Sequence, residues 1–139
     1  MSRVVIGVGN TARGDDAAGV VAAQRAGAHG VVATAPFQLI DLWEGASDVV
    51  VVDAARSGAP PGTIHRFEVG SQALPTGVLG GSTHSIGVAE VVELAGALDR
   101  LPERLMVYGI EIGGMSQGSA LSPEVEAAVD TVVAEVGGA

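Results

Sequence analysis

The stretch that decides the fold is DVVVVDA, residues 48–54. Four consecutive valines bounded by carboxylates predict a buried strand. The run RVVIGV (3–8) is also continuously apolar, which is typical of a strand covered on both faces. These two runs predict strands of a sheet that has helices on each side.

Strands and helices alternate along the chain on both sides of this stretch. Further strands are predicted at 31–34, 63–69 and 104–114. Helices are predicted at 15–30, 87–101 and 122–136, with a short helical or irregular piece near 37–46. The alternation predicts one α/β domain spanning 1–139, with a mainly parallel sheet of about five strands sandwiched by helices.

Glycines and apolar residues indicate how two of these helices pack. The helix at 15–30 has acids in its first turn and Gly30 as its expected stop. Gly19 and Gly27 weaken a helix, so their presence suggests close packing. In 87–101 the apolar residues recur at helical spacing, at Val88, Val91, Val92, Ala95 and Leu98.

Composition and charge argue against several classes of function. Sixteen acidic residues against seven arginines give a net charge of −9, which disfavours nucleic acid or an anionic membrane as a partner. The chain has no cysteine, which removes disulfides, thiolate metal sites and cysteine nucleophiles. No apolar run approaches the roughly 20 residues of a membrane span, and no signal-peptide pattern opens the chain. We therefore expect a cytoplasmic protein.

Three side chains fall in the loops at predicted strand ends, where open α/β sheets form their sites. Asp16 follows the first strand, Asp53 ends the valine strand, and His84 precedes the helix at 87–101. Two carboxylates and one imidazole would leave open positions on a bound ion for water or substrate. This ligand set suits a borderline cation such as Ni²⁺ or Zn²⁺.

Each of these residues also has a structural interpretation. Asp15 is expected to cap the helix and Asp16 to be the ligand, although the two could exchange roles. Asp53 could be a turn residue, and His84 a hydrogen-bonded loop histidine. The other histidines, His29 and His65, are interpreted as structural.

Two short motifs suggest other chemistries. GVGNTA (7–12) fits a dinucleotide-binding glycine loop, but the adjacent Asp15 and Asp16 would repel a pyrophosphate. GMSQG (114–118) fits a nucleophile elbow around Ser116, but no histidine follows that serine. A chance match is the better explanation in a chain with 21 glycines.

Read together, four segments resemble the hydrogenase maturation protease family, in the same order as in that family. They are GVGNTARGDDAAGV, VVVVDAARSGAPPGTIHRFE, STHSIGVAEVVELAGAL and VYGIEIG with LSPEVEAAV. The resemblance implies a three-layer α/β/α fold around a twisted sheet. It also implies a metal-binding cleft formed by Asp16, Asp53 and His84, which would be both the metal ligands and the catalytic residues.

The resemblance further implies an endopeptidase that acts on the large-subunit precursor of a nickel-iron hydrogenase. Such an enzyme recognises nickel already inserted in the precursor and then removes a C-terminal peptide, with Zn²⁺ or another divalent cation as a surrogate for Ni²⁺. We expect it to act as a monomer. The alternative is a non-catalytic metal-dependent assembly factor or chaperone for the same client.

The chain departs from the family at one turn. Many members carry an Asp-Gly-Gly-Thr-like turn after the second strand, thought to line the substrate cleft. Here the corresponding stretch is ATAPFQL (33–39), with Thr34 or a neighbour where the aspartate would stand. The role assigned to that turn is therefore open in this chain.

Overall fold

The computed structural model describes residues 3–9, 17–70, 74, 79, 87–112 and 121–137. Within them one sheet has the strand order β2-β1-β3-β5-β4. Neighbouring pairs among β1, β2, β3 and β5 are parallel, whereas β4 runs antiparallel to β5 at an edge. The strands are β1 (Arg3–Val8), β2 (Gly30–Ala33), β3 (Asp48–Ala55), β4 (Ile64–Glu68) and β5 (Arg104–Glu111).

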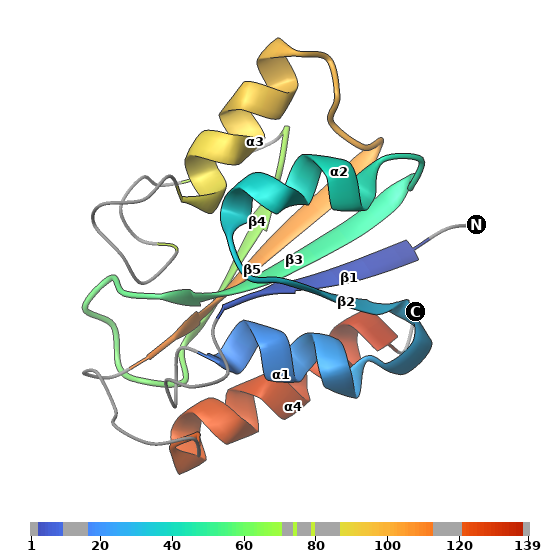
Figure 1. The fold of residues 1–139 in the computed structure, drawn as a ribbon. Helices are drawn as coiled ribbons and strands as arrows, with labels where there is room; N and C mark the ends of the chain where they lie inside the picture. The colour runs from blue at the N-terminus through green and yellow to red at the C-terminus, as the bar shows by residue number, and fades with distance from the viewer. Residues whose placement is uncertain are drawn as a thin grey trace.

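Helices cover both faces of the sheet. Figure 1 shows α1 and α4 on one face and α2 and α3 on the other, which confirms the three-layer α/β/α fold. Within the described ranges, no helix is both long and apolar enough to cross a membrane. The helices are α1 (Ala18–Arg25), α2 (Leu39–Trp43), α3 (Val88–Ala97) and α4 (Pro123–Gly137), with 3₁₀ turns η2 (Gly27–His29) and η3 (Pro36–Gln38).

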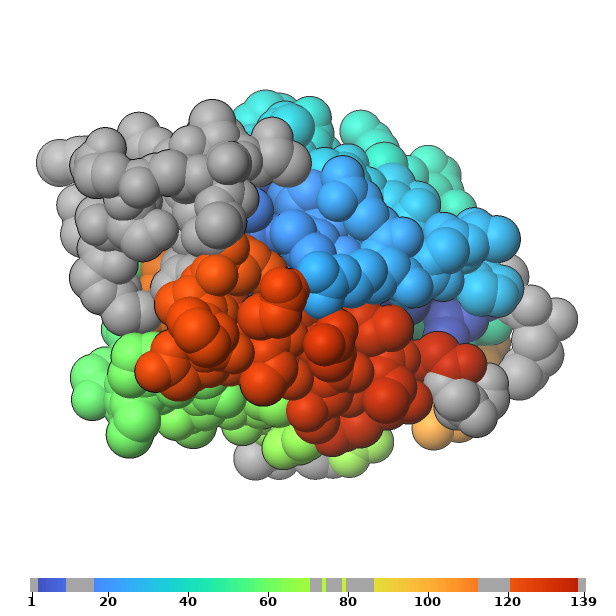
Figure 2. Space-filling model, turned by 90° about the horizontal axis from the view of Figure 1, so that it is seen from below, coloured from blue at the N-terminus to red at the C-terminus, as the bar shows by residue number. Residues whose placement is uncertain are grey.

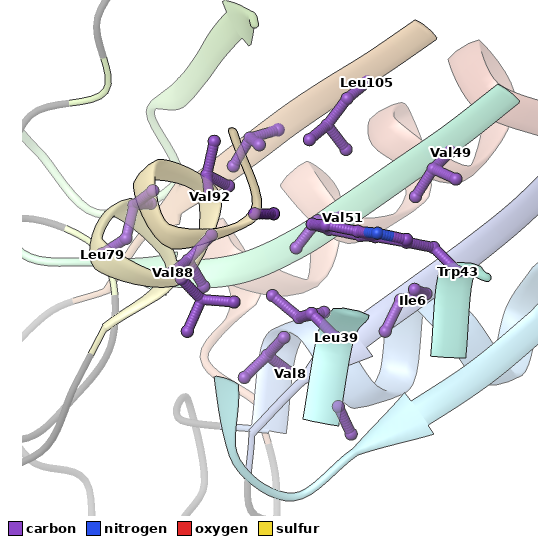
Figure 3. Packing of buried hydrophobic residues seen from close by; sticks show 14 of the residues in the cluster. Ile6, Val8, Leu39, Trp43, Val49, Val51, Leu79, Val88, Val92 and Leu105 are labelled. Atoms are coloured by element: carbon purple, nitrogen blue, oxygen red, sulfur yellow. The ribbon is translucent and has the colours of Figure 1, made fainter. Parts of the chain in front are cut away.

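The valines of β3 explain why its sequence is continuously apolar. Side chains alternate along a strand, so Val49 and Val51 enter the core under α2 and α3, while Val50 and Val52 enter the core under α1 and α4. Figure 3 shows the first core, in which Trp43 of α2 lies among aliphatic side chains. The Trp43 indole Nε1–H donates to the Arg100 carbonyl at 2.9 Å, so its polar atom is satisfied.

Helix α1 lies unusually close to the centre of the sheet. A Cβ on Gly19 would stand 2.3 Å from the carbonyl oxygen of Val52, and one on Gly7 would stand 1.9 Å from the carbonyl oxygen of Gly19. Close packing at Gly19 is therefore confirmed. Gly27 is different: it lies in η2 with φ +75 and has open space around it, so its role is in the turn.

The first and third helices are shorter than the sequence predicts. α1 begins at Ala18 with Ala17 as its N-cap residue, and it ends at Arg25, well before Gly30. Asp15, the predicted cap, lies outside the described residues. The single turn of η2 intervenes because Gly27 adopts a positive φ. In α3 the predicted buried positions are confirmed except for Leu98, which is 54% exposed because the helix has ended by that residue.

Ion pairs fasten α4 to its neighbours. Figure 2 shows α1 and α4 side by side, with the green β3–β4 connection along the other flank of α4. Arg25 of α1 contacts Glu126 at 2.8 Å and Asp130 at 2.8 Å, both on α4. On the other flank, Arg66 of β4 forms a bidentate pair with Glu135 of α4.

Candidate functional site

The parallel strands bring their carboxyl ends to one edge of the sheet, at the left of Figure 1. Asp53 lies there in β3 and is only 3% exposed. Its Oδ1 accepts a hydrogen bond from the Ala54 backbone N–H at 2.8 Å. Asp53 belongs to the strand, which excludes its interpretation as a turn residue. A carboxylate so deeply buried is a strong candidate for a functional group.

Described residues close in sequence to the other two predicted ligands, Asp16 and His84, lie near β3. The start of α1 lies against it, because a Cβ on Gly19 would meet the Val52 carbonyl oxygen. Leu79 forms an antiparallel bridge with Ala55, two residues beyond Asp53. Gly87 precedes α3 and lies beside Leu79: a Cβ on Gly87 would stand 3.3 Å from the Leu79 carbonyl oxygen.

Asp16 and His84 themselves lie outside the described residues, as do Asp15 and Ser116. Their convergence with Asp53 therefore stays a prediction. Within the described part of the chain, no group of three or more histidine, cysteine, aspartate or glutamate side chains is arranged to hold a metal ion. The glycine-loop motif and the predicted loop at 70–86 also fall mostly outside these residues.

The turn after β2 has no carboxylate where many family members carry the aspartate of an Asp-Gly-Gly-Thr-like turn. Thr34 follows the last residue of this strand, and its backbone N–H donates to the Gln38 side-chain oxygen at 2.8 Å. That bond closes a turn onto η3, in which Phe37 is 71% exposed. At this strand end, a neutral turn and an exposed aromatic ring stand where the resemblance implies an aspartate.

A second buried carboxylate lies at the same edge, and the sequence interpretation missed it. Glu111, the last residue of β5, is 2% exposed and pairs in register with Ala55 of β3. Its Oε1 accepts from Ser57 Oγ at 2.7 Å and from His65 Nε2 at 2.9 Å. Its Oε2 accepts from the backbone N–H of Ser57 at 2.8 Å and of Gly58 at 3.2 Å.

These four donors keep Glu111 ionised. Burial alone would raise the pKa of its carboxyl, but the hydrogen bonds from Ser57, His65 and the Gly58 amide outweigh burial and lower that pKa. Because an ionised carboxylate can only accept, His65 Nε2 carries a hydrogen and donates a hydrogen bond to Glu111. His65 is thus structural, as the sequence interpretation holds, and its ring also stacks on Phe67.

Ser57, His65 and Glu111 do not form a nucleophilic triad. In such a triad the acid and the serine occupy opposite nitrogens of the imidazole. Here the serine hydroxyl and the imidazole both donate to the same oxygen of Glu111, and Ser57 Oγ lies 3.4 Å from the nitrogen that makes that bond. The cluster is an anchor for the start of the β3–β4 connection.

A signal for Glu111 exists in the sequence. Glu111 is the last residue of an apolar strand, and Asp53 lies two residues before the end of another. The rule that places sites at strand ends therefore applies to both residues. What the sequence does not reveal is its set of partners, since Ser57 and His65 lie 54 and 46 residues away.

Comparison with known proteins places these features in a family. A family model described as HycI, hydrogenase maturation protease, matches residues 32–138. The hydrogenase expression/formation protein HupD of Thiocapsa roseopersicina is 30% identical over 133 residues, which cover 88% of this chain and 60% of that protein. The chain thus spans about three fifths of the length of this curated relative.

Solved structures of similar proteins share the fold. The [NiFe] hydrogenase maturation protease HybD from Thermococcus kodakarensis aligns with TM-score 0.75 and 27% identity, covering 98% of this chain and 97% of that one. The hydrogenase maturating endopeptidase HybD from E. coli aligns with TM-score 0.76 and 21% identity over 98% of this chain and 90% of that one.

Proposed function

This chain belongs to the hydrogenase maturation protease family, and we propose that it cuts the C-terminal extension from the large-subunit precursor of a nickel-iron hydrogenase after nickel insertion. The observation that carries this proposal is the buried carboxylate of Asp53 at the carboxyl edge of the sheet. Buried ionisable groups at such edges are characteristic of active sites.

Asp16, Asp53 and His84 would act together on nickel that the precursor carries. Two carboxylates and an imidazole form a ligand set that suits nickel and leaves positions for the precursor's own ligands. The proposal is supported by described residues close in sequence to Asp16 and His84: Gly19 lies against Val52 of β3, and Gly87 lies beside Leu79, which forms a bridge with Ala55 of β3. The metal belongs to the substrate, so its presence in the precursor would license the cut.

In the proposed reaction, docking on nickel positions the scissile peptide bond beside Asp53. A water molecule, oriented by a carboxylate, adds to the peptide carbonyl carbon, and the C–N bond breaks as the amine leaves with a proton. The products are a carboxylate on the large subunit and a free C-terminal peptide. This route needs neither a serine nor a cysteine nucleophile, in keeping with the absence of cysteine.

The deciding experiment incubates the purified chain with nickel-loaded and nickel-free precursor and follows the precursor's mass. We expect shortening of the loaded form only. Asp53→Asn and His84→Ala should abolish shortening while the circular dichroism spectrum stays unchanged. Matched controls are Asp41→Asn, on the exposed surface of α2, and His29→Ala, at the opposite edge of the sheet, which should both cut normally.

Two outcomes would contradict the proposal. Full activity of Asp53→Asn or His84→Ala would remove those residues from the site. Stable binding of the loaded precursor without any cut would instead identify a metal-dependent assembly factor, the alternative function for this fold.

A further inference from the structure

The connection between β3 and β4 begins only three residues after Asp53, at Arg56. It runs through Ser57, Gly58 and two prolines before β4 begins at Ile64. Its start therefore forms part of the same edge as Asp53. A loop rich in glycine and proline has few side chains that can make contacts within the loop. Its position therefore depends on contacts with neighbouring strands and helices.

Glu111 fixes the start of this loop. Both carboxylate oxygens are used, one for the side chains of Ser57 and His65 and the other for the amides of Ser57 and Gly58. Only an ionised carboxylate can accept all four, because a neutral amide of the same shape offers one acceptor oxygen and an unwanted donor. Hydrogen bonds to a charged group are also the stronger kind.

The far end of the loop is fixed by backbone contacts. The Gly62 N–H donates to the Glu111 carbonyl at 2.8 Å, and the Glu111 N–H donates to the Thr63 carbonyl at 2.8 Å. Gly62 has φ +91, and a Cβ there would stand 2.7 Å from the Glu124 carbonyl oxygen of α4. One residue, Glu111, thus ties both ends of the loop to β5.

We propose that Glu111 is a positioning residue for peptide cleavage, which acts by holding residues 56–62 as a fixed wall beside Asp53. This inference rests on the proposed function. The wall keeps the precursor's backbone in line with the carboxylate at β3, and a displacement of about 1 Å in such a site can lower a rate about a hundredfold. Glu111 itself does not touch the reacting atoms.

The test compares Glu111→Gln with Glu103→Gln. Glu103 is an exposed glutamate just before the start of β5, so this control makes the same chemical change at the opposite end of the strand. Hydrogen exchange at the Ser57 and Gly58 amides measures the loop, urea unfolding measures the fold, and kcat and KM for the nickel-loaded precursor measure function.

For Glu111→Gln we expect exchange at both amides to rise about tenfold or more, since it loses bonds to a charged acceptor. We expect kcat to fall about tenfold while KM changes less than about threefold, because the wall orients the reacting bond. Glu103→Gln should match the wild type in every measurement.

Ser57→Ala provides the second variant if Glu111→Gln does not fold. It removes one donor on an exposed side chain and leaves the carboxylate and both amides in place. Loss of one such bond should accelerate exchange at Gly58 and lower kcat by about threefold.

The outcomes separate this inference from the proposed function. The positioning role is overturned if the loop amides exchange faster but kcat is unchanged, or if kcat falls while their exchange is unchanged. If the wild-type chain leaves the nickel-loaded precursor uncut, the proposed function fails and the positioning role fails with it.

Discussion

The close contact of α1 with the sheet makes Gly19 sensitive to any added side chain. A Cβ at this position would stand 2.3 Å from the Val52 carbonyl oxygen and 2.6 Å from that of Val8, whereas ordinary contact begins at 3.4 Å. Both neighbours are backbone atoms of central strands and cannot move aside. In Gly19→Ala, α1 must therefore retreat by about 1 Å.

The cost can be estimated from two opposing effects. Overpacking of this kind costs about 1–3 kcal/mol. The better helix propensity of alanine offsets less than about 1 kcal/mol of it near a helix end. We expect Gly19→Ala to lose about 2 kcal/mol, which for a chain of 139 residues lowers Tm by roughly 6–10 °C.

Gly96 in α3 supplies the matched control. A Cβ there would meet only the Leu101 side chain, at 3.5 Å, which is ordinary contact. Gly96→Ala should therefore gain about 0.5–1 kcal/mol from helix propensity and raise Tm by roughly 2–5 °C. The same substitution is thus expected to act with opposite sign in the two helices.

Thermal and urea unfolding, followed by circular dichroism, measure both variants. A Gly19→Ala protein as stable as the wild type would refute the packing argument, because α1 could not then lie where the structure places it. We also expect Gly19→Ala to slow processing of the precursor, since the start of α1 abuts Val52, the neighbour of Asp53.

Three further measurements test other parts of the structure. Trp43→Phe should lose about 2 kcal/mol in urea unfolding, because it deletes the bond to the Arg100 carbonyl and leaves a small cavity; an unchanged midpoint would contradict this. The single tyrosine, Tyr108, should titrate in the ultraviolet above its ordinary pKa of 10.0, because burial and then the charge of Glu135 raise that pKa; Glu135→Gln should lower it, and no change would refute the assignment. Since the folded pKa of Glu111 lies below its ordinary 4.5, its contribution is present above that pH and is lost on acidification through the folded pKa. The stability difference between wild type and Glu111→Gln should thus shrink as the pH falls below 4.5, and a constant difference would contradict the charged anchor.

Much of the fold follows from local sequence. The valine run of β3 is apolar at every position because both of its faces are buried. A continuous apolar run of this kind can be recognised in the sequence without knowledge of its neighbours. The helix ends were harder to predict. The helix predicted to stop at Gly30 ends at Arg25, and Leu98 continues the apolar spacing of α3 beyond the point where that helix ends.

The candidate site likewise has one residue that the sequence predicts and one whose role depends on distant segments. Asp53 could be predicted because a single strand places it at the carboxyl edge, so the identity of its own strand was sufficient. Glu111 ends another strand at the same edge, yet its importance comes from Ser57, Gly58 and His65 on two other segments. No pattern within β5 encodes those partners.

The sequence by itself determined the class of the fold, its two most continuously apolar strands and the carboxylate at the end of the valine run, because burial imposes a periodicity that each segment carries alone. Only the tertiary structure decided how close α1 lies to the sheet and which groups surround Glu111. These depend on the pairing of β5 with β3 and β4, which brings together residues from distant parts of the chain, and contacts of that kind exist only once the whole sheet has formed.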